Sequence, residues 1–187
     1  MKVALFGGSF NPIHNGHLEI CNEIISENIA DEVWIVPCGN HAFGKDLAPA
    51  DHRIKMIDLV LKENGKVKLI DIEVKSPEKS YTSQTIEKLK KQFPHDFYLV
   101  IGADNLKDLT KWHNFEYLKN NVAYLLINRP EFNAENELGI KISSFLKLEN
   151  NASSTEIREN VRKKISIKGL VPEEVESYII KRRLYAQ

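Results

Sequence analysis

Short apolar runs of strand length alternate with helical stretches along most of this chain, and this alternation is what most constrains its fold. Strand-like runs cover residues 3–6, 33–36, 67–70, 97–101 and 122–127. Apolar residues at helical spacing fall between them, over 16–29, 51–64 and 82–93. An apparent strand at 142–148 and two closing helices follow, at 154–164 and 172–182. Because strands that alternate with helices pair in parallel, the sequence predicts an α/β fold with a parallel sheet flanked by helices.

Length and charge narrow the class of protein. At 187 residues the chain suits one well-buried domain rather than two. Lys and Arg total 26, as do Asp and Glu, so no net charge favours nucleic acid or an anionic membrane. The longest apolar runs are strand-sized, and no signal-type segment precedes the first strand. We expect a soluble, cytoplasmic protein that binds small molecules and neither nucleic acid nor membrane.

The two cysteines indicate the redox compartment of the protein. Cys21 falls on an apparent helix face, Cys38 follows a strand, and their spacing is not that of metal ligands. We expect both to be buried free thiols in a reducing compartment, and we expect no metal site made by the protein alone.

The first strand-like run leads into a glycine turn and a helix start, in segment 7–18. Gly7 and Gly8 stand where side chains would keep backbone N–H groups away from a ligand. A helix begins near Gly16, so its positive dipole end faces this turn. His14 and His17 lie at that end, where imidazoles can donate to phosphate oxygens and take up charge as pyrophosphate leaves. An ordinary βα turn is the alternative, but the combination in one short segment favours a polyphosphate site.

A second helix start carries hydroxyl groups and an arginine, in segment 152–158. Ser153, Ser154 and Thr155 precede or open the predicted helix, and Arg158 lies one turn into it. The structural alternative is that Ser153 or Ser154 is only an N-cap. Together with the glycine turn, this helix start suits the far end of a triphosphate.

Polar and aromatic residues also mark other predicted strand and helix ends, at the sheet edge where ligands bind in such folds. Gly102 ends the run 97–101 and permits close approach, while Asp104 either accepts from a ribose or caps a helix. Trp112 either stacks on a planar heteroaromatic ring or lies in the core. The hydroxyls of 80–83 precede a helix, with N-capping as their minimum role.

Taken together, these motifs resemble those of the nucleotidyltransferases with a His-x-Gly-His signature, and most closely the bacterial nicotinate-nucleotide adenylyltransferases of NAD biosynthesis. His14 favours this family, since phosphopantetheine adenylyltransferases usually carry threonine there. The resemblance runs nearly end to end, through segments 7–17, 80–82, 102–112, 153–158 and 170–185. It implies a single Rossmann-like nucleotidyltransferase domain over residues 1–187.

The resemblance also implies a reaction. The phosphate of a mononucleotide attacks the α-phosphorus of ATP in line, pyrophosphate leaves, and no covalent enzyme intermediate forms. ATP is then a substrate accompanied by Mg²⁺, and nicotinate or nicotinamide mononucleotide is the acceptor. Positioning and charge stabilisation supply most of the catalysis in such transfers.

Residue roles follow from the same resemblance, motif by motif. Phosphates would be held by His14, His17 and Arg158, assisted by Ser154 and Thr155. The path of ATP would be lined by Gly7, Gly8, Ser9 and Phe10. Adenosine would meet Gly102 and Asp104. The pyridine nucleotide would meet Thr82 and Trp112, the latter by stacking.

One loop departs from the family pattern. The family usually has a proline-asparagine loop leading to two prolines, a histidine and a lysine, whereas residues 37–45 read Pro-Cys-Gly-Asn-His-Ala-Phe-Gly-Lys. His41 and Lys45 offer comparable charges at a different spacing, and Lys45 is either a catalytic phosphate clamp or a solvated lysine. Ala152 also replaces a usual branched residue. Because this loop flanks the acceptor in the family, a different phosphorylated acceptor stays an alternative, as do a non-catalytic nucleotide-binding protein and a homo-oligomeric assembly.

Overall fold

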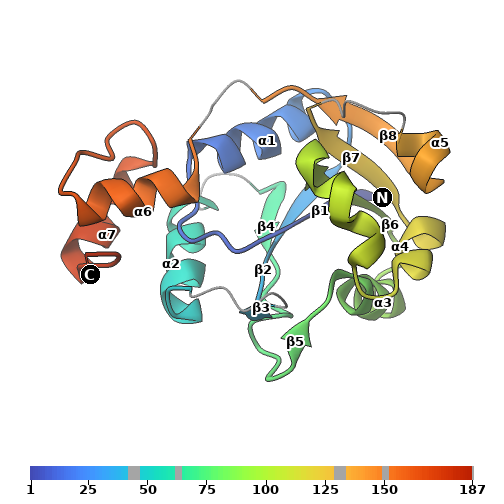
Figure 1. Ribbon diagram of the computed structural model, residues 1–187, viewed down its shortest axis with the longest axis horizontal. Helices are drawn as coiled ribbons and strands as arrows, with labels where there is room; N and C mark the ends of the chain where they lie inside the picture. The colour runs from blue at the N-terminus through green and yellow to red at the C-terminus, as the bar shows by residue number, and fades with distance from the viewer. Residues whose placement is uncertain (42–46, 62–64, 129–133, 149–151, 187) are drawn as a thin grey trace.

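A parallel β-sheet forms the middle of the protein (Figure 1). The computed structural model describes residues 1–41, 47–61, 65–128, 134–148 and 152–186. The strands of the sheet are β1 (Lys2–Gly8), β2 (Glu32–Pro37), β4 (Val67–Leu69), β6 (Asp96–Gly102), β7 (Ala123–Ile127) and β8 (Lys141–Leu146). They pair in the order β4-β2-β1-β6-β7-β8, each neighbour parallel to the next. The chain changes direction across the sheet between β1 and β6, and ligands bind at such switch points.

Successive side chains of β1 point to opposite faces of the sheet and enter two separate cores. Ala4 and Phe6 join a cluster on one face, and Val3 and Leu5 join another on the opposite face. The first face is covered by α1 (Asn15–Ser26), α2 (Ala50–Leu61), α6 (Ser154–Arg162) and α7 (Glu173–Arg182). The second is covered by α3 (Thr82–Gln92), the 3₁₀ helix η1 (Ala103–Lys111) and α4 (Phe115–Asn121). Strands buried on both faces account for the continuous apolar runs in the sequence.

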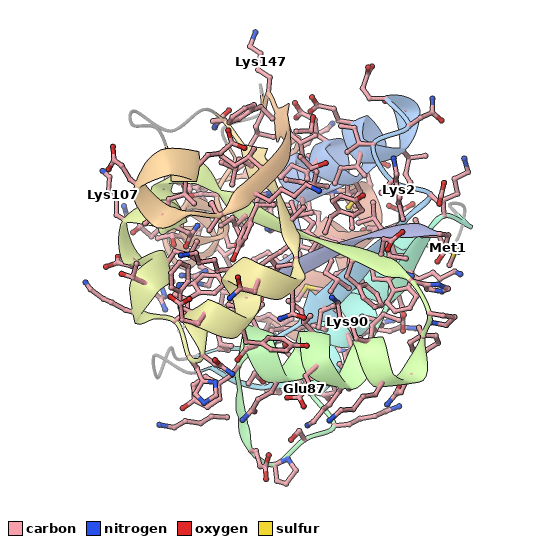
Figure 2. The ribbon with its side chains drawn as sticks, turned by 90° about the vertical axis from the view of Figure 1, so that its right-hand side faces the viewer. Met1, Lys2, Glu87, Lys90, Lys107 and Lys147 are labelled. Carbon is pink, nitrogen blue, oxygen red and sulfur yellow. The ribbon has the colours of Figure 1, made fainter. Side chains whose placement is uncertain are left out.

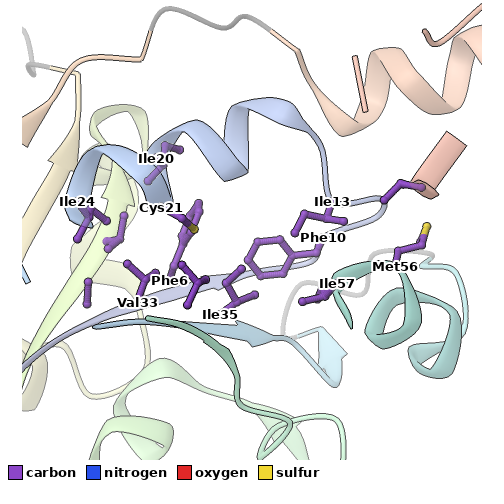
Figure 3. Packing of buried hydrophobic residues seen from close by; sticks show 14 of the residues in the cluster. Phe6, Phe10, Ile13, Ile20, Cys21, Ile24, Val33, Ile35, Met56 and Ile57 are labelled. Carbon is purple, nitrogen blue, oxygen red and sulfur yellow. The ribbon is translucent and has the colours of Figure 1, made fainter. Parts of the chain in front are cut away.

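Helix α1 shows how the first core is built (Figure 3). Its residues Ile20, Cys21 and Ile24 face the sheet and are at most 3% exposed. Phe10, from the loop before the helix, fills the space between the sheet and Ile57 of α2. Burying a side chain of this size contributes about 2 kcal/mol, so the loop is held by the core as well as by hydrogen bonds.

The predicted strands and helices are confirmed, with differences at their ends. Helix α1 ends at Ser26 rather than at 29, because Asn28 adopts a left-handed φ of 51°. Helix α6 ends at Arg162 for the same reason, with Lys164 at a φ of 56°. The prediction missed shorter elements: β3 (Asn40–His41), β5 (Lys79–Ser80), η1, α4 and α5 (Ala134–Leu138).

The closing helices lie at one end of the molecule beside α2 (Figure 1). The hydroxyl of Tyr178 on α7 and Nδ1 of His52 on α2 lie 2.8 Å apart. The loop before α7 reaches the start of α1, where the backbone N–H of Asn15 donates to the carbonyl of Leu170 at 3.0 Å and its side chain donates to Gly169 at 2.8 Å. The C-terminal segment therefore fixes the start of α1.

Charged side chains project from the surface, among them Lys90, Lys107 and Lys147 (Figure 2). Exposed ion pairs such as Lys91 with Glu87, at 2.7 Å, contribute little to stability in water. In the part of the chain that the structure describes, no helix has the length and apolar character needed to cross a bilayer.

Candidate active site

A cavity of about 610 Å³ opens at the carboxyl edge of the sheet, in the size range of small-molecule sites. Its walls come from the ends of β1, β2 and β6, the first turns of α3 and the end of η1. Among the residues predicted from sequence, the cavity is lined by Gly7, Gly8, Ser9, Thr82 and Trp112. Cys38 also faces it and is only partly buried, so the expectation of two buried thiols is wrong for Cys38.

The glycine turn leaves its backbone accessible. A Cβ on Gly7 would meet no atom of the described residues within 4 Å, so the space above this backbone is open. A Cβ on Gly8 would lie 3.1 Å from the ring of Phe10. That ring is 1% exposed and packs edge-on against Phe6, with 5.5 Å between ring centroids. Phe10 is therefore a core residue that has only its backbone to offer a nucleotide.

His14 and His17 stack on each other at the start of α1. Their ring centroids are 3.7 Å apart, and their planes differ by 28°. The backbone N–H of His14 donates to Nδ1 of His17 at 3.2 Å, so the proton of the neutral His17 ring lies on Nε2. Nδ1 of His14 is buried and makes no hydrogen bond within the described residues. A buried polar atom in that state costs free energy and is typical of functional sites.

Burial also sets the charge of the two rings. Desolvation lowers the pKa of His14 from the ordinary 6.5 to about 4. Desolvation, with a smaller contribution from His14, holds the pKa of His17 well below its ordinary value. Both rings are therefore neutral at pH 7 in the protein without ligands and act as hydrogen-bonding groups. They can take up charge once an anion lies beside them, because a nearby negative charge raises a histidine pKa.

Asn11 joins three distant parts of the chain at this site, and sequence reasoning missed it. Its side chain is buried, and its Oδ1 accepts from the backbone N–H of Ala48 at 3.2 Å and from the Tyr185 hydroxyl at 2.8 Å. Its backbone carbonyl accepts from Nη1 of Arg158 at 2.8 Å. A polar residue inside the first motif was the available signal, but its partners lie too far along the chain to be inferred.

Helix α6 docks on the same loop. Ser153 is its N-cap, with Oγ accepting from the backbone N–H three residues later at 3.1 Å, which confirms capping for this serine. Ser154 instead donates to the carbonyl of Pro12 at 2.9 Å. Thr155 accepts from Nη2 of Arg158 at 3.2 Å. The two predicted motifs are thus in direct contact, and their shared anion site stays a prediction.

The four residues that are expected to contact the nucleosides lie in different surroundings. Asp104 is exposed in the first turn of η1, and the helix has Gly102 as its N-cap, so Asp104 does not cap it. A Cβ on Gly102 would contact the Asp104 carboxylate, an exposed side chain that can move aside, so this contact alone does not require glycine. Trp112 packs against the second core and also lines the cavity, where its stacking on a ring stays a prediction. Thr82 opens α3 at the cavity wall.

The structure gathers most of the predicted residues into two groups, whereas Phe10, Gly102 and Asp104 belong to neither. The cavity group holds Gly7, Gly8, Ser9, Thr82 and Trp112. The anion group surrounds the loop before α1 and holds His14, His17, Ser154, Thr155 and Arg158. The strand-to-helix loop at 8–14 connects them. Lys45 lies outside the described residues, and His41 belongs to β3, whose backbone pairs with Ser80 of β5.

Glu73 is an acidic residue of the cavity wall that sequence reasoning missed. Its Oε1 accepts from the Thr85 hydroxyl at 2.7 Å, and the Ser80 side chain also bonds to it. Ser80 in turn accepts from the backbone N–H of Gly39 at 3.0 Å. Burial raises the pKa of Glu73 while these hydrogen bonds act in the opposite direction. Glu73 thus ties β5 and α3 together at the cavity, and Ser80 extends the link to the backbone of Gly39.

Arg53 supports two residues of the cavity wall, Ser9 and Cys38, and was also missed. Although charged, it is 2% exposed, and its guanidinium donates to three backbone carbonyls. These belong to Ser9 at 2.9 Å, Cys38 at 2.8 Å and Ala48 at 3.0 Å. A buried charge is tolerated when its donors are satisfied in this way. Arg53 thereby links the glycine turn to the end of β2.

Similarity to known proteins runs along nearly the whole chain. Residues 5–160 match the cytidylyltransferase-like family. The nicotinate-nucleotide adenylyltransferase of Bacillus subtilis is 33% identical over 187 residues, with 98% of each chain covered. The probable nicotinate-nucleotide adenylyltransferase of Fusobacterium nucleatum is 37% identical over 190 residues, covering 97% of this chain and 98% of that protein. A solved structure of Plasmodium falciparum nicotinic acid mononucleotide adenylyltransferase complexed with NaAD superposes with a TM-score of 0.83 at 26% identity, covering 98% of this chain and 97% of the other.

Proposed function

We propose that this chain, which belongs to the cytidylyltransferase-like family, transfers the adenylyl group of ATP to the phosphate of nicotinate mononucleotide and releases pyrophosphate. The reaction makes a dinucleotide precursor of NAD. Its nicotinate-nucleotide adenylyltransferase relatives and the similarity to the Plasmodium falciparum structure support this assignment. The structural observation that carries the proposal is the docking of α6 on the loop before α1, residues 9–14, which we call the histidine loop. This loop lies beside the cavity that Trp112 lines.

The reaction is an in-line displacement at phosphorus. A phosphate oxygen of the acceptor forms a new bond to the α-phosphorus of ATP, and the bond from that phosphorus to its bridging oxygen breaks. Pyrophosphate leaves with the electron pair of the broken bond. The protein contributes position and charge stabilisation, which together can supply most of the rate enhancement of such a transfer.

In this proposal the anion group holds the leaving phosphates. Nε2 of His17 has a proton to donate, since Nδ1 already accepts from the backbone. Arg158 brings a permanent positive charge to the same loop, and two of its nitrogens are oriented by Asn11 and Thr155. An arginine oriented in this way loses little conformational entropy on meeting a phosphate.

The cavity group holds the nucleosides. The open space above Gly7 lets a phosphate or ribose approach the backbone. Trp112 and Thr82 lie where a pyridine ring could stack and bond. Gly102, at the end of β6, and Asp104, in the first turn of η1, are assigned to the adenosine from outside the cavity lining. These nucleoside contacts are part of the proposal.

Mg²⁺ enters this proposal with ATP. In the described ranges, no cluster of three or more His, Cys, Asp or Glu side chains could hold a metal ion. The groups around the histidine loop are imidazole, hydroxyl and guanidinium, which suit phosphate oxygens better than they suit Mg²⁺. We therefore treat Mg²⁺ as the counter-ion of the triphosphate substrate, bound through its phosphates.

An acceptor panel tests the proposal. Purified protein is incubated with ATP and Mg²⁺ and with nicotinate mononucleotide, nicotinamide mononucleotide or other phosphorylated acceptors, and pyrophosphate is measured. We expect release with a pyridine mononucleotide. Release only with another acceptor would identify a different nucleotidyltransferase, and ATP binding without release would identify a non-catalytic protein.

Two further expectations need experiments of their own. Fractionation of cells tests the cytoplasmic location, and light scattering of the purified protein tests the homo-oligomer.

A further inference from the structure

Tyr185, which lies beyond the end of α7 at Arg182, reaches the histidine loop from the C-terminal segment. Its hydroxyl donates to Oδ1 of Asn11 at 2.8 Å. The Asn11 side chain is 1% exposed, and the same oxygen accepts from the backbone N–H of Ala48 at 3.2 Å. A buried amide with two donors on one oxygen loses hydrogen bonds if it rotates, so Asn11 is held in a single orientation.

Two residues with strained backbones lie at this hydrogen bond. Phe10, which precedes Asn11, has a φ of 44°, and Tyr185 itself has a φ of 62°. Bulky side chains rarely adopt a positive φ, because Cβ then crowds the backbone. Such conformations persist only where the surrounding structure holds them, and they gather at functional sites. The bond thus joins two segments whose backbones are held in costly conformations beside the anion group.

The backbone of Asn11 connects this bond to Arg158. The Asn11 carbonyl accepts from Nη1 of Arg158 at 2.8 Å, and Nη2 of the same guanidinium donates to the Thr155 hydroxyl at 3.2 Å. A guanidinium has further N–H donors besides these two. The direction of the Asn11 carbonyl therefore helps to set where those further donors point, and the bond from Tyr185 helps to set that direction.

The Tyr185 hydroxyl stays protonated at neutral pH. Burial raises its pKa, although the charges of Arg158 and Arg53 act in the opposite direction. A protonated phenol is a hydrogen-bond donor, so the bond to Asn11 does not depend on titration near neutral pH. The link from the C-terminal segment to Arg158 is therefore in place before a substrate arrives.

We propose that Tyr185 is a positioning residue of the reaction, which acts through Asn11 to hold Arg158 where it meets the leaving phosphates. This inference rests on the proposed function. A cation that is held in advance stabilises developing charge without having to be ordered during the reaction, so its orientation contributes to the rate.

Tyr185→Phe tests the inference, because it removes the hydroxyl and keeps the ring. We expect kcat for pyrophosphate release to fall about fivefold to tenfold, as for a lost hydrogen bond that orients a phosphate-binding group. KM for nicotinate mononucleotide should change by less than about twofold, since the acceptor cavity is not altered.

Tyr178→Phe is the matched control. Tyr178 and Tyr185 both pack, partly buried, against the first core. The hydroxyl of Tyr178 lies 2.8 Å from Nδ1 of His52, however, and so links α7 to α2 instead of to the histidine loop. Loss of this hydroxyl should leave kcat within about twofold of the unmodified protein.

A second background shows whether the effect passes through Arg158. Arg158→Met lowers kcat by itself, because the guanidinium is lost. Adding Tyr185→Phe to that variant should lower kcat by less than about a further twofold, because the group that Tyr185 positions is then absent. The same loss in both backgrounds would mean that Tyr185 acts only on the fold, and it would overturn the inference.

Binding of magnesium pyrophosphate, measured by calorimetry, keeps the result independent of turnover. We expect the affinity to be about fivefold weaker in Tyr185→Phe and unchanged in Tyr178→Phe. Equal affinity of the unmodified protein and a folded Tyr185→Phe variant, or no binding to the unmodified protein, overturns the inference. Absence of pyrophosphate release with either mononucleotide instead contradicts the proposed function, and the binding comparison then still decides the role of Tyr185.

Discussion

The stacked histidines are neutral donors in a desolvated loop, and their chemistry depends on what binds beside them. Their pKa values are lowered by burial, so their positive charge is not present before the substrate arrives. Burying a neutral imidazole costs less free energy than burying an imidazolium does. The phosphates of ATP supply the negative charge that makes protonation favourable.

Replacing His17 tests its contribution to the rate. In His17→Ala the Nε2 donor is lost, so we expect kcat to fall about a hundredfold or more, equivalent to about 3 kcal/mol of transition-state stabilisation. Steady-state pyrophosphate release measures this. His52→Ala is the control, since His52 of α2 bonds to Tyr178 of α7, and the variant should keep near-normal turnover per folded molecule. Unchanged turnover in His17→Ala would exclude a catalytic role.

Triphosphate binding should be accompanied by proton uptake. The pKa of His14 is about 4 without ligand, and an adjacent polyanion raises it, so the complex holds more protons than the separate molecules do. ATP affinity should therefore increase as the pH falls below neutrality. Calorimetry in buffers of different ionisation enthalpy measures the uptake, and His14→Asn should reduce it. Proton release, or no buffer dependence, would be inconsistent with neutral histidines at the phosphates.

Several site residues could be predicted from sequence because their signals are local. His14, His17, Ser154 and Arg158 lie in short motifs at helix starts, and the structure brings those two motifs into contact. Phe10 is expected on the ATP path, but its ring is buried in the core. The contacts of Asn11, Arg53 and Glu73 could not be inferred, because the partners of these side chains are distant in sequence.

At the scale of elements, α6 holds the histidine loop in place through hydrogen bonds to the loop backbone. Its start is fixed by an N-cap, and its residues Ser154 and Arg158 donate to the carbonyls of residues 12 and 11, respectively. Loss of the cap should loosen both the helix and the loop that it holds.

Ser153→Ala tests that cap. The substitution leaves a helix N–H unsatisfied, so we expect the free energy of unfolding to fall by about 1 kcal/mol and the affinity for ATP to weaken. Chemical denaturation and calorimetry measure the two effects. Ser143→Ala, at an exposed position on β8, should change stability by less than about 0.5 kcal/mol. Equal stability of the two variants would show that α6 does not depend on its cap.

Long elements with a clear apolar period were predicted, and short ones were not. Helix α3 buries Ile86 and Leu89 at helical spacing and was recognised, whereas α4 buries only Leu118 among its residues and shows no period. The paired strands β3 and β5 contain two residues each, and their pairing depends on contacts across the chain rather than on local pattern.

For the whole molecule, a sheet covered on both faces fixes the site rigidly but places two titratable rings beside the core. Above pH 6.5 His14 is neutral in both folded and unfolded states, and its pKa has no effect on stability. Below that pH the unfolded chain binds a proton that the folded protein does not accept until about pH 4. Stability is therefore lost as the pH falls through this window.

The size of that loss can be measured. For His14 alone it amounts to about 3 kcal/mol by the low end of the window, and His17 adds a shift in the same direction. Urea denaturation at a series of pH values should show the decline. His14→Gln should make the decline shallower, because glutamine does not titrate. A decline of the same steepness in His14→Gln would mean that other groups control acid unfolding.

The central claim is adenylyl transfer to a pyridine mononucleotide by direct displacement, and ATP labelled at the α-phosphate tests it most directly. In a single incubation with Mg²⁺ and nicotinate mononucleotide, the label is followed into dinucleotide, protein and free nucleotide while pyrophosphate is counted. We predict that the label appears in the dinucleotide in a one-to-one ratio with pyrophosphate and that none is retained on the protein. Label bound to the protein, or dinucleotide absent while ATP is consumed, would contradict the account.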